Sequence, residues 1–245
     1  MSKKQVYHPG KQVGLSQKKT EMVTTNGVTM NNGKPFKLMI GIPCTDMMHT
    51  DFVRCLMALK RPADSTVLFI KGTILPQSRD ILASTTLSNG FTHLLFMDSD
   101  MNFPADALAK LAAHDADIVT GLAVSRREPH QPCIYSAINY TDADFAAGKP
   151  HIVTCDDWAE KGDYFEVAGC GMAFCLIKAE VLQKMKDTYG EFFKYIKTYG
   201  EDLSFCIRAT SLGYKIMVDN SFVLGHIGQK TFTTKHIMKP EDVEE

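Results

Sequence analysis

The stretch His93-Leu94-Leu95-Phe96-Met97-Asp98-Ser99-Asp100 decides the fold class of this chain. Residues 94–97 form an unbroken apolar run, which is typical of a strand buried on both faces of a parallel sheet. Asp98 and Asp100 follow at the carboxyl end of that strand, where open parallel sheets bind their ligands. Strand periodicity would point both carboxylates to one side of the sheet and Ser99 to the other. We therefore expect a binding site at this edge of the sheet.

The paired carboxylates indicate a bound cation. Two anionic groups held close together are costly unless a positive charge joins them. Hard carboxylate oxygens suit Mg²⁺ or Mn²⁺. The alternative is structural, because Asp often caps a helix or fills a turn, and Pro104 follows shortly after. The position at a strand end, the spacing and the pairing together favour the metal site.

Strand and helix patterns alternate on both sides of this segment. Further strands are expected at residues 36–42, 66–70 and 117–124, and helices at 51–59, 77–88 and 104–113, the last opened by Pro104. This order predicts an α/β fold of one domain, with a mostly parallel, Rossmann-like sheet sandwiched by helices. The second half is less regular. It predicts strands at 134–140, 151–154, 172–177 and 214–218, a helix from 179 and another at 202–212.

The composition is that of an ordinary globular protein. The chain has 245 residues, of which 44% are apolar and 22% charged, which excludes disorder over most of its length. The net charge of −1 gives the whole molecule no general affinity for polyanions. Seven Cys without metal-ligand spacing predict reduced thiols and a cytoplasmic location. No apolar run approaches the ~20 residues of a membrane span and the N-terminus lacks a signal peptide, so we expect no transmembrane segment.

Three parts of the chain follow from these patterns. Residues 1–35 form a polar arm whose lysines far outnumber its single acid, Glu21. A flexible, solvated arm is the favoured interpretation, with a nucleic-acid contact as the alternative. Residues 36–228 form the folded domain, in which the regular half at 36–125 is typical of a nucleotide-binding scaffold and the less regular half at 126–228 elaborates it. Residues 229–245 form a C-terminal tail that ends in an acidic run.

Two classes of enzyme place an Asp-x-Asp motif after an apolar strand. Phosphohydrolases of the haloacid dehalogenase type use the first Asp as the nucleophile, here Asp98, and normally carry Thr or Val two residues after the second. Asn102 stands at that position, and no acidic pair follows where that class needs one. In nucleotide-sugar glycosyltransferases the two acids hold a cation on the donor diphosphate. The rest of the chain favours this second class.

Later segments resemble the GT-A-fold glycosyltransferases, particularly the large family-two type. Residues 167–177, with Gly169 and Gly171, resemble the glycine loop of that family. Residues 200–208 resemble its Glu-Asp motif at a helix start, and His226 stands where many members carry a metal-binding His. Residues 40–45 resemble the first strand and the proline of its nucleotide pocket, and Ser78-Arg79-Asp80 stands where the family often has Ala-Arg-Asn.

The resemblance implies a metal-dependent transferase that moves a sugar from a nucleoside-diphosphate sugar to an acceptor hydroxyl. It implies Asp98, Asp100 and His226 as ligands of Mn²⁺ or Mg²⁺. It implies donor contacts at Pro43, Thr45, Arg79, Asp98, Ser99, Gly169 and Gly171. Asp202 is the expected general base of an inverting reaction, and Glu201 is expected to position the base or the acceptor.

One segment departs from the family. Lys71-Gly72-Thr73 stands where an acidic cluster usually holds the nucleobase, so the sequence does not identify the nucleotide. The acceptor is equally open, with a glycan favoured and a modified nucleic-acid base as the alternative. A nucleotide-sugar-binding protein without catalysis is a further alternative, against which the intact acids and His226 argue. The sequence makes no prediction about the oligomeric state.

Overall fold

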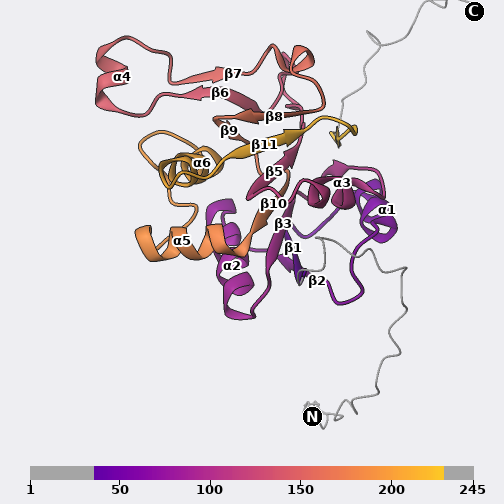
Figure 1. Cartoon of the computed structure of the whole chain (residues 1–245). Coiled ribbons are helices and arrows are strands. Elements are labelled where there is room, and N and C mark those ends of the chain that lie inside the picture. The colour runs from indigo at the N-terminus through magenta and orange to yellow at the C-terminus, as the bar shows by residue number, and fades with distance from the viewer. Residues whose placement is uncertain (1–35, 229–245) are drawn as a thin grey trace, which may run out of the picture.

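The computed structural model describes residues 36–228. Its central sheet has seven strands, which lie side by side in the order β2 (Thr66–Ile70), β1 (Leu38–Pro43), β3 (His93–Met97), β10 (Phe174–Lys178), β5 (Ile118–Gly121), β11 (Ile216–Asp219) and β8 (Tyr164–Val167) (Figure 1). Strands β2, β1, β3, β5 and β11 share one direction, whereas β10 and β8 oppose it. The predicted α/β class with a mostly parallel sheet is confirmed. The predicted arm at 1–35 and tail at 229–245 lie outside the described residues.

Strand β10 occupies the centre of the sheet, between β3 and β5, and is antiparallel to both. The Thr120 hydroxyl of β5 donates a hydrogen bond to the Phe174 carbonyl oxygen at 3.1 Å across this pairing. Sequence patterning predicted a strand here, but neither its place nor its direction. An antiparallel strand that is buried on both faces has the same continuous apolar pattern as a parallel one, so periodicity cannot distinguish them.

Helices cover both faces of the sheet. Helices α2 (Leu75–Ser88), α5 (Ala179–Tyr189) and α6 (Glu201–Ser211) pack on one face, and α1 (Thr50–Ala58) and α3 (Ala107–Ala113) on the other (Figure 1). Successive residues of β3 alternate between the two cores: Leu94 and Phe96 face the first, and Leu95 and Met97 face the second. The apolar run in the sequence thus becomes a strand with two buried faces.

Two smaller sheets extend the central one. Strands β7 (Ile152–Thr154), β6 (Ile134–Ile138) and β9 (Gly169–Cys170) form a three-stranded sheet, with α4 (Asp142–Ala146) between β6 and β7 and the 3₁₀ turn η1 (Trp158–Glu160) after β7. This layer lies at the end of the molecule away from α2 (Figure 1). Strands β4 (Met101–Asn102) and β12 (Gly225–His226) form a two-stranded sheet directly after the Asp-Ser-Asp segment.

One predicted helix boundary is wrong. The third helix begins at Ala107 rather than at Pro104. The Ala107 N–H donates to the Pro104 carbonyl oxygen at 3.1 Å, so the proline opens a turn that precedes the helix. Proline fixes its own φ but suits a turn as well as a first helical position, and the sequence alone does not separate the two.

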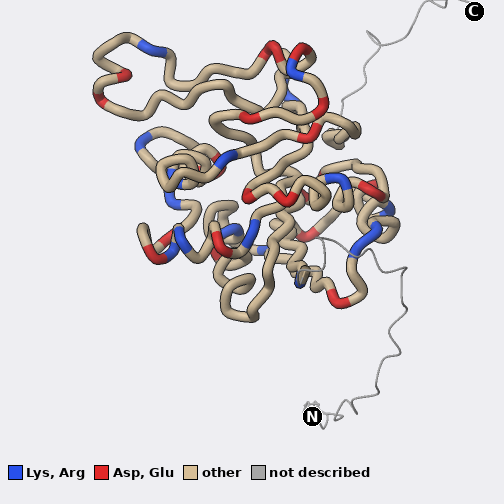
Figure 2. Tube along the Cα trace, viewed as in Figure 1, with Lys and Arg blue, Asp and Glu red and all other residues tan. Residues whose placement is uncertain are grey.

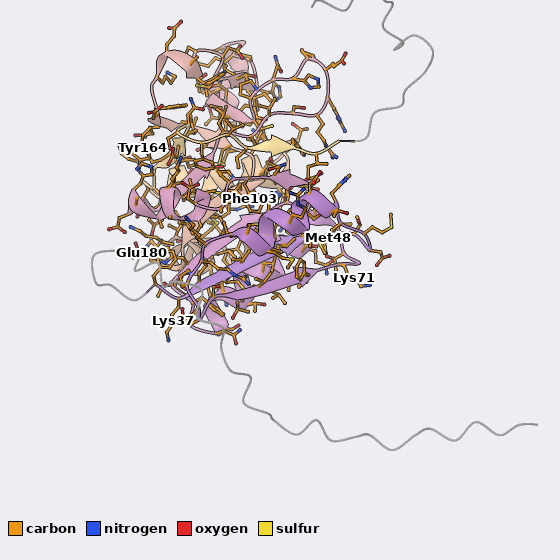
Figure 3. All side chains as sticks on the ribbon, turned by 90° about the vertical axis from the view of Figure 1, so that its right-hand side faces the viewer. Lys37, Met48, Lys71, Phe103, Tyr164 and Glu180 are labelled. Carbon is orange, nitrogen blue, oxygen red and sulfur yellow. The ribbon has the colours of Figure 1, made fainter. Side chains whose placement is uncertain are left out.

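The surface carries both signs of charge. The carboxyl ends of β1 and β2 lie at the same edge of the sheet. Figure 2 shows Lys and Arg interspersed with Asp and Glu over the described chain. Figure 3 shows Lys37, which precedes β1, at one side of the molecule, with Met48 and Lys71, which follow β1 and β2, at the other. Within residues 36–228, no helix combines the length and the apolar character that a membrane crossing requires.

Candidate functional site

A pocket of about 360 Å³ opens at the edge where β1, β2 and β3 end. Its walls come from five parts of the chain: Pro43, Cys44 and Thr45; Thr73, Leu75 and Ser78; Asp98, Ser99 and Asp100; Arg126; and His226. The structure therefore brings together most of the donor and metal residues expected from the sequence. Arg79, Gly169, Gly171, Glu201 and Asp202 do not line this pocket.

The Asp-Ser-Asp segment is a turn. Strand β3 ends at Met97, the Asp98 N–H donates to the Ala173 carbonyl oxygen at 2.9 Å, and the Met101 N–H donates to the Asp98 carbonyl oxygen at 3.3 Å. Strand periodicity therefore does not apply to this segment. Asp98 and Asp100 line the same pocket, as expected, but Ser99 lines it too instead of facing the other side. Within this turn Asp98 contacts Arg79 and Asp100 contacts His226.

His226 reaches Asp100 through the pairing of β12 with β4, in which His226 lies opposite Met101. The imidazole Nε2 is 3.5 Å from Asp100 Oδ1, and Nδ1 is 2.8 Å from the Val124 carbonyl oxygen. A carbonyl oxygen only accepts hydrogen bonds, so Nδ1 carries a hydrogen and Nε2 is the nitrogen that faces the carboxylate. Asp100 Oδ2 also lies 3.1 Å from Arg126 Nη1.

The electrostatics of this cluster follow from those contacts. Burial works to raise the pKa of Asp100, but the hydrogen bond and charge of His226, with the charge of Arg126, hold it below its usual value. The hydrogen bond to Asp100 in turn raises the pKa of His226. The pair therefore favours an anionic carboxylate and attracts positive charge, either a proton on the imidazole or a metal ion between the two groups.

The donor atoms fit a divalent cation that shares its coordination with a phosphate. Within residues 36–228, no three His, Cys, Asp or Glu side chains gather closely enough to form a complete metal cage. Asp100 and His226 supply one oxygen and one nitrogen, and Asp98 uses Oδ1 toward Arg79, which leaves its Oδ2 for the pocket. Mg²⁺ at nucleotide sites takes one or two carboxylates and completes its shell with phosphate oxygens and water, so an incomplete protein shell suits that role.

Arg79 is buried between two acids. Its side chain is 3% exposed, with Nη2 3.0 Å from Asp98 Oδ1 and Nη1 2.7 Å from Glu201 Oε1. One guanidinium therefore joins the turn after β3 to the first residue of α6. The sequence interpretation expected Arg79 to contact the donor, whereas its observed partners are these carboxylates.

Asp202 is the second residue of α6 and is set back from the pocket. Its Oδ1 accepts a hydrogen bond from the Leu203 N–H at 2.7 Å. Burial raises the pKa of Asp202, and the nearby Arg79 charge and the Leu203 N–H only partly oppose this. Burial likewise raises the pKa of Glu201 against the charge of Arg79. Raised carboxyl pKa values at the start of one helix are typical of an acid–base site.

The two predicted glycines have different surroundings. A Cβ added at Gly169 would lie 2.5 Å from Ile138 Cδ1 and 3.3 Å from Cys206 Cβ, so this glycine lets β9 pack against its neighbours. A Cβ at Gly171 would meet Cys133 Cβ at an ordinary 3.5 Å and would lie 3.9 Å from Asp202 Oδ2. Gly171 therefore borders the candidate base, whereas Gly169 lies in the packed interior.

The pocket contains residues that the sequence interpretation did not assign. Thr73 and Ser78 both line it, with their hydroxyl oxygens 2.5 Å apart. Gly72 has φ +80°, and this turn brings Thr73 to the pocket. The sequence did contain a signal for Thr73, since Lys71-Gly72-Thr73 stands where the related family has an acidic cluster. A glycine turn and a hydroxyl at this place predict a neutral polar lining instead of an acidic one.

Comparison with known proteins identifies the architecture. No family model and no curated protein matches the sequence. Among solved structures, A197 from STIV matches with a TM-score of 0.57 and 18% identity, over 79% of this chain and 87% of A197. GalNAc-T7, crystallised with UDP, GalNAc and Mn²⁺, matches with a TM-score of 0.52 and 13% identity, over 84% of this chain. The chain has a GT-A fold. The alignment covers 46% of the GalNAc-T7 chain, and identities this low establish the fold alone.

Proposed function

We propose that this protein is a metal-dependent glycosyltransferase that binds a nucleoside-diphosphate sugar in the pocket at the ends of β1, β2 and β3. The observation that carries the proposal is the convergence of Asp100 and His226 in a pocket that Pro43, Thr45 and Thr73 also line. The pocket offers metal-ligating atoms, the guanidinium of Arg126 and neutral polar groups. A nucleoside diphosphate needs both charged contacts for its phosphates and neutral polar contacts for its base.

The residues that would hold the metal are Asp100 and His226, with donor phosphate oxygens and water completing its shell. Asp98, the third ligand expected from the sequence, pairs with Arg79 and forms no three-residue cluster with them among residues 36–228. Bound there with the donor, Mn²⁺ or Mg²⁺ would supply Lewis-acid stabilisation of the negative charge that develops on the leaving diphosphate. The imidazole favours Mn²⁺ over Mg²⁺, because nitrogen is a softer ligand than oxygen. Arg126 lines the same wall, and its guanidinium is suited to a phosphate oxygen.

Asp202 is the proposed general base. During transfer the bond from the sugar carbon to the diphosphate breaks, a bond from that carbon to the acceptor oxygen forms, and the hydroxyl proton passes to the Asp202 carboxylate. The raised pKa of Asp202 makes it a stronger base than an exposed Asp, which brings it closer to the range that general-base catalysis needs. Attack opposite the leaving group inverts the sugar carbon, in keeping with the family-two resemblance.

The proposed acceptor and the proposed location of the protein rest on the sequence alone. A glycan hydroxyl is the favoured acceptor. A modified nucleic-acid base recruited by residues 1–35 is the alternative, and a cytoplasmic location agrees with either. The fold shared with GalNAc-T7, which was crystallised with UDP, GalNAc and Mn²⁺, supports a nucleotide-sugar donor for this chain.

The test is a thermal-shift panel of UDP, GDP, dTDP and their sugar conjugates, with Mn²⁺ and with a chelator. A transferase gains stability from one nucleotide class with Mn²⁺, because a ligand that binds the folded state raises its apparent stability. Free sugar or transferred sugar should then appear from the bound conjugate. Release of inorganic phosphate from simple phosphate esters would instead identify a phosphohydrolase, and binding without any turnover would identify a non-catalytic binding protein.

A further inference from the structure

The buried guanidinium of Arg79 lies where two parts of the site meet. We infer that Arg79 is a positioning residue: it clamps Glu201 to the turn that contains Asp98, and thereby fixes the start of α6 so that Asp202 is left to act as the base. This inference rests on the proposed function and assigns to Arg79 a role other than donor binding.

The contacts of Arg79 account for two of its three nitrogens. Each terminal nitrogen is within 3.0 Å of a different carboxylate, and the side chain is 3% exposed. Nε has no hydrogen-bond partner among residues 36–228. Arginine cannot lose its proton in a protein, so a buried guanidinium requires anionic partners, and Asp98 and Glu201 are the two it has. Removing the guanidinium would leave the Glu201 carboxylate, with its side chain 13% exposed, without its ion-pair partner.

Ser78 and Asp80, the residues on either side of Arg79 in α2, also contact the surroundings of the site. Ser78 lines the pocket. Asp80 Oδ1 accepts hydrogen bonds from the N–H groups of Phe192 and Phe193, at 3.3 and 3.0 Å, in the segment that leads into α6. Three consecutive residues of α2 thus reach the pocket, the two acids and the approach to α6. A helix packed on the sheet is a rigid support, which is what precise placement of a base requires.

The clamp distinguishes the roles of the two acids. One carboxylate oxygen of Glu201 forms an ion pair with Arg79. Asp202 forms no ion pair with Arg79 and instead accepts a hydrogen bond from the Leu203 N–H. Burial raises the pKa of both acids, and the Arg79 charge partly offsets that rise. Glu201 is therefore a positioning residue together with Arg79, and Asp202 is the acid of the pair that is not held by the guanidinium.

The experiment compares Arg79→Gln with Arg54→Gln, a matched control on α1 whose side chain is 78% exposed. Melting temperatures are measured for both, and for the double variant Arg79→Gln/Glu201→Gln. Loss of one partner from a buried ion pair should lower the melting temperature of Arg79→Gln by at least about 6 °C. The control should shift by less than about 2 °C. The double variant should recover at least half of the loss, because the unpaired carboxylate is gone. Equal shifts in Arg79→Gln and the control, or a larger loss in the double variant, would overturn the clamp.

The second readout uses the hydrolysis of the nucleotide sugar that the panel identifies, in which water replaces the acceptor. We expect Arg79→Gln to lower kcat about 100-fold, the scale of a misplaced catalytic group, with KM within about 3-fold. The acid limb of the kcat profile should move to higher pH, because the cation that lowers the pKa of Asp202 is gone. A raised KM with normal kcat would make Arg79 a donor contact and overturn the inference. Failure of every nucleotide to bind the wild type would refute the proposed function, while the melting experiment would still decide the clamp.

Discussion

His226 Nε2 and Asp100 Oδ1 lie 3.5 Å apart, although the two residues are far apart in the sequence. The short pairing of β12 with β4 brings them together, and the Ile227 N–H donates to the Asp100 carbonyl oxygen at 2.7 Å. Gly225 permits this approach, because a Cβ there would lie 3.1 Å from Asn102 Cβ. The pairing of β12 with β4 therefore gives this edge of the sheet both an oxygen ligand and a nitrogen ligand.

The Asp202→Asn variant should separate catalysis from donor binding. Asparagine has the size and most of the hydrogen-bonding capacity of Asp202 but cannot take the acceptor proton. We expect Mn²⁺-dependent donor affinity within a few-fold of the wild type and a loss of at least about 100-fold in transfer, the usual effect of removing a general base. Steady-state kinetics with the bound donor, beside calorimetric donor titrations, provide the measurement.

The Asp100→Asn variant is the comparison for that experiment. It should damage donor affinity and turnover together, since it acts through the metal. If Asp202→Asn transferred the sugar at a near-normal rate, another acid would have to be the general base. If Asp202→Asn lost donor affinity as severely as Asp100→Asn, Asp202 would belong to the nucleotide site.

The glycines of the loop should differ in their contribution to stability. Gly169→Ala places a methyl group 2.5 Å from Ile138 Cδ1, so we expect it to lower the free energy of unfolding by about 1–3 kcal/mol, as overpacking does. Gly171→Ala meets ordinary contact distances and should change that free energy by less than about 1 kcal/mol. Urea denaturation of the two variants tests this. Equal losses would show that neighbouring groups move to accept the methyl at Gly169.

His93 should make the protein sensitive to acid. Burial, helped by the charge of Lys178, lowers the pKa of this histidine from 6.5 to about 4. Between those values the unfolded chain binds a proton that the folded protein excludes, so stability falls as the pH falls from about 6.5 toward 4. From pH 7 to pH 5 this group should lower the free energy of unfolding by about 2 kcal/mol.

Urea titrations at the two pH values check the acid effect. The His93→Gln variant should show a shallower pH dependence than the wild type by about that amount. His151→Gln, which changes an exposed histidine, serves as the control and should retain the wild-type dependence. An unchanged slope in His93→Gln would mean that His93 is protonated in the folded protein.

The sequence predicted the parts of the fold that depend on local pattern. Strand β3 and helices α2 and α5 lie close to where hydrophobic periodicity placed them. A strand with two buried faces appears in the sequence as a continuous apolar run, and a helix with one buried face appears as apolar residues at helical spacing. The central place of β10 was not predictable, since strand order depends on contacts between residues distant in the chain. Pattern also missed the two-residue strands β4 and β12, which are too short to have a periodicity.

The site shows the same division. The structure brings Pro43, Thr45, Asp98, Ser99, Asp100 and His226, which the motifs singled out, into the lining of one pocket. The motifs did not predict that Ser99 would share this lining or that the two carboxylates would have Arg79 and His226 as partners, because both depend on a turn and on tertiary contacts. The link from Arg79 to Glu201 joins segments that no sequence motif connects. Motifs thus indicate which groups gather, and tertiary packing decides which of them face one another.

Calorimetric titration of UDP, GDP, dTDP and ADP into the protein, with Mn²⁺ and then with a chelator, tests the central claim most directly. We predict that at least one nucleotide binds with Mn²⁺ and that its affinity falls at least about 10-fold in the chelator, which corresponds to a loss of about 1.4 kcal/mol of binding free energy. His226→Ala should reproduce that loss in the presence of Mn²⁺, while His49→Ala, outside the pocket, should not. Equal affinity with Mn²⁺ and with chelator, or no binding of any nucleotide, would contradict a metal-dependent donor site at Asp100 and His226.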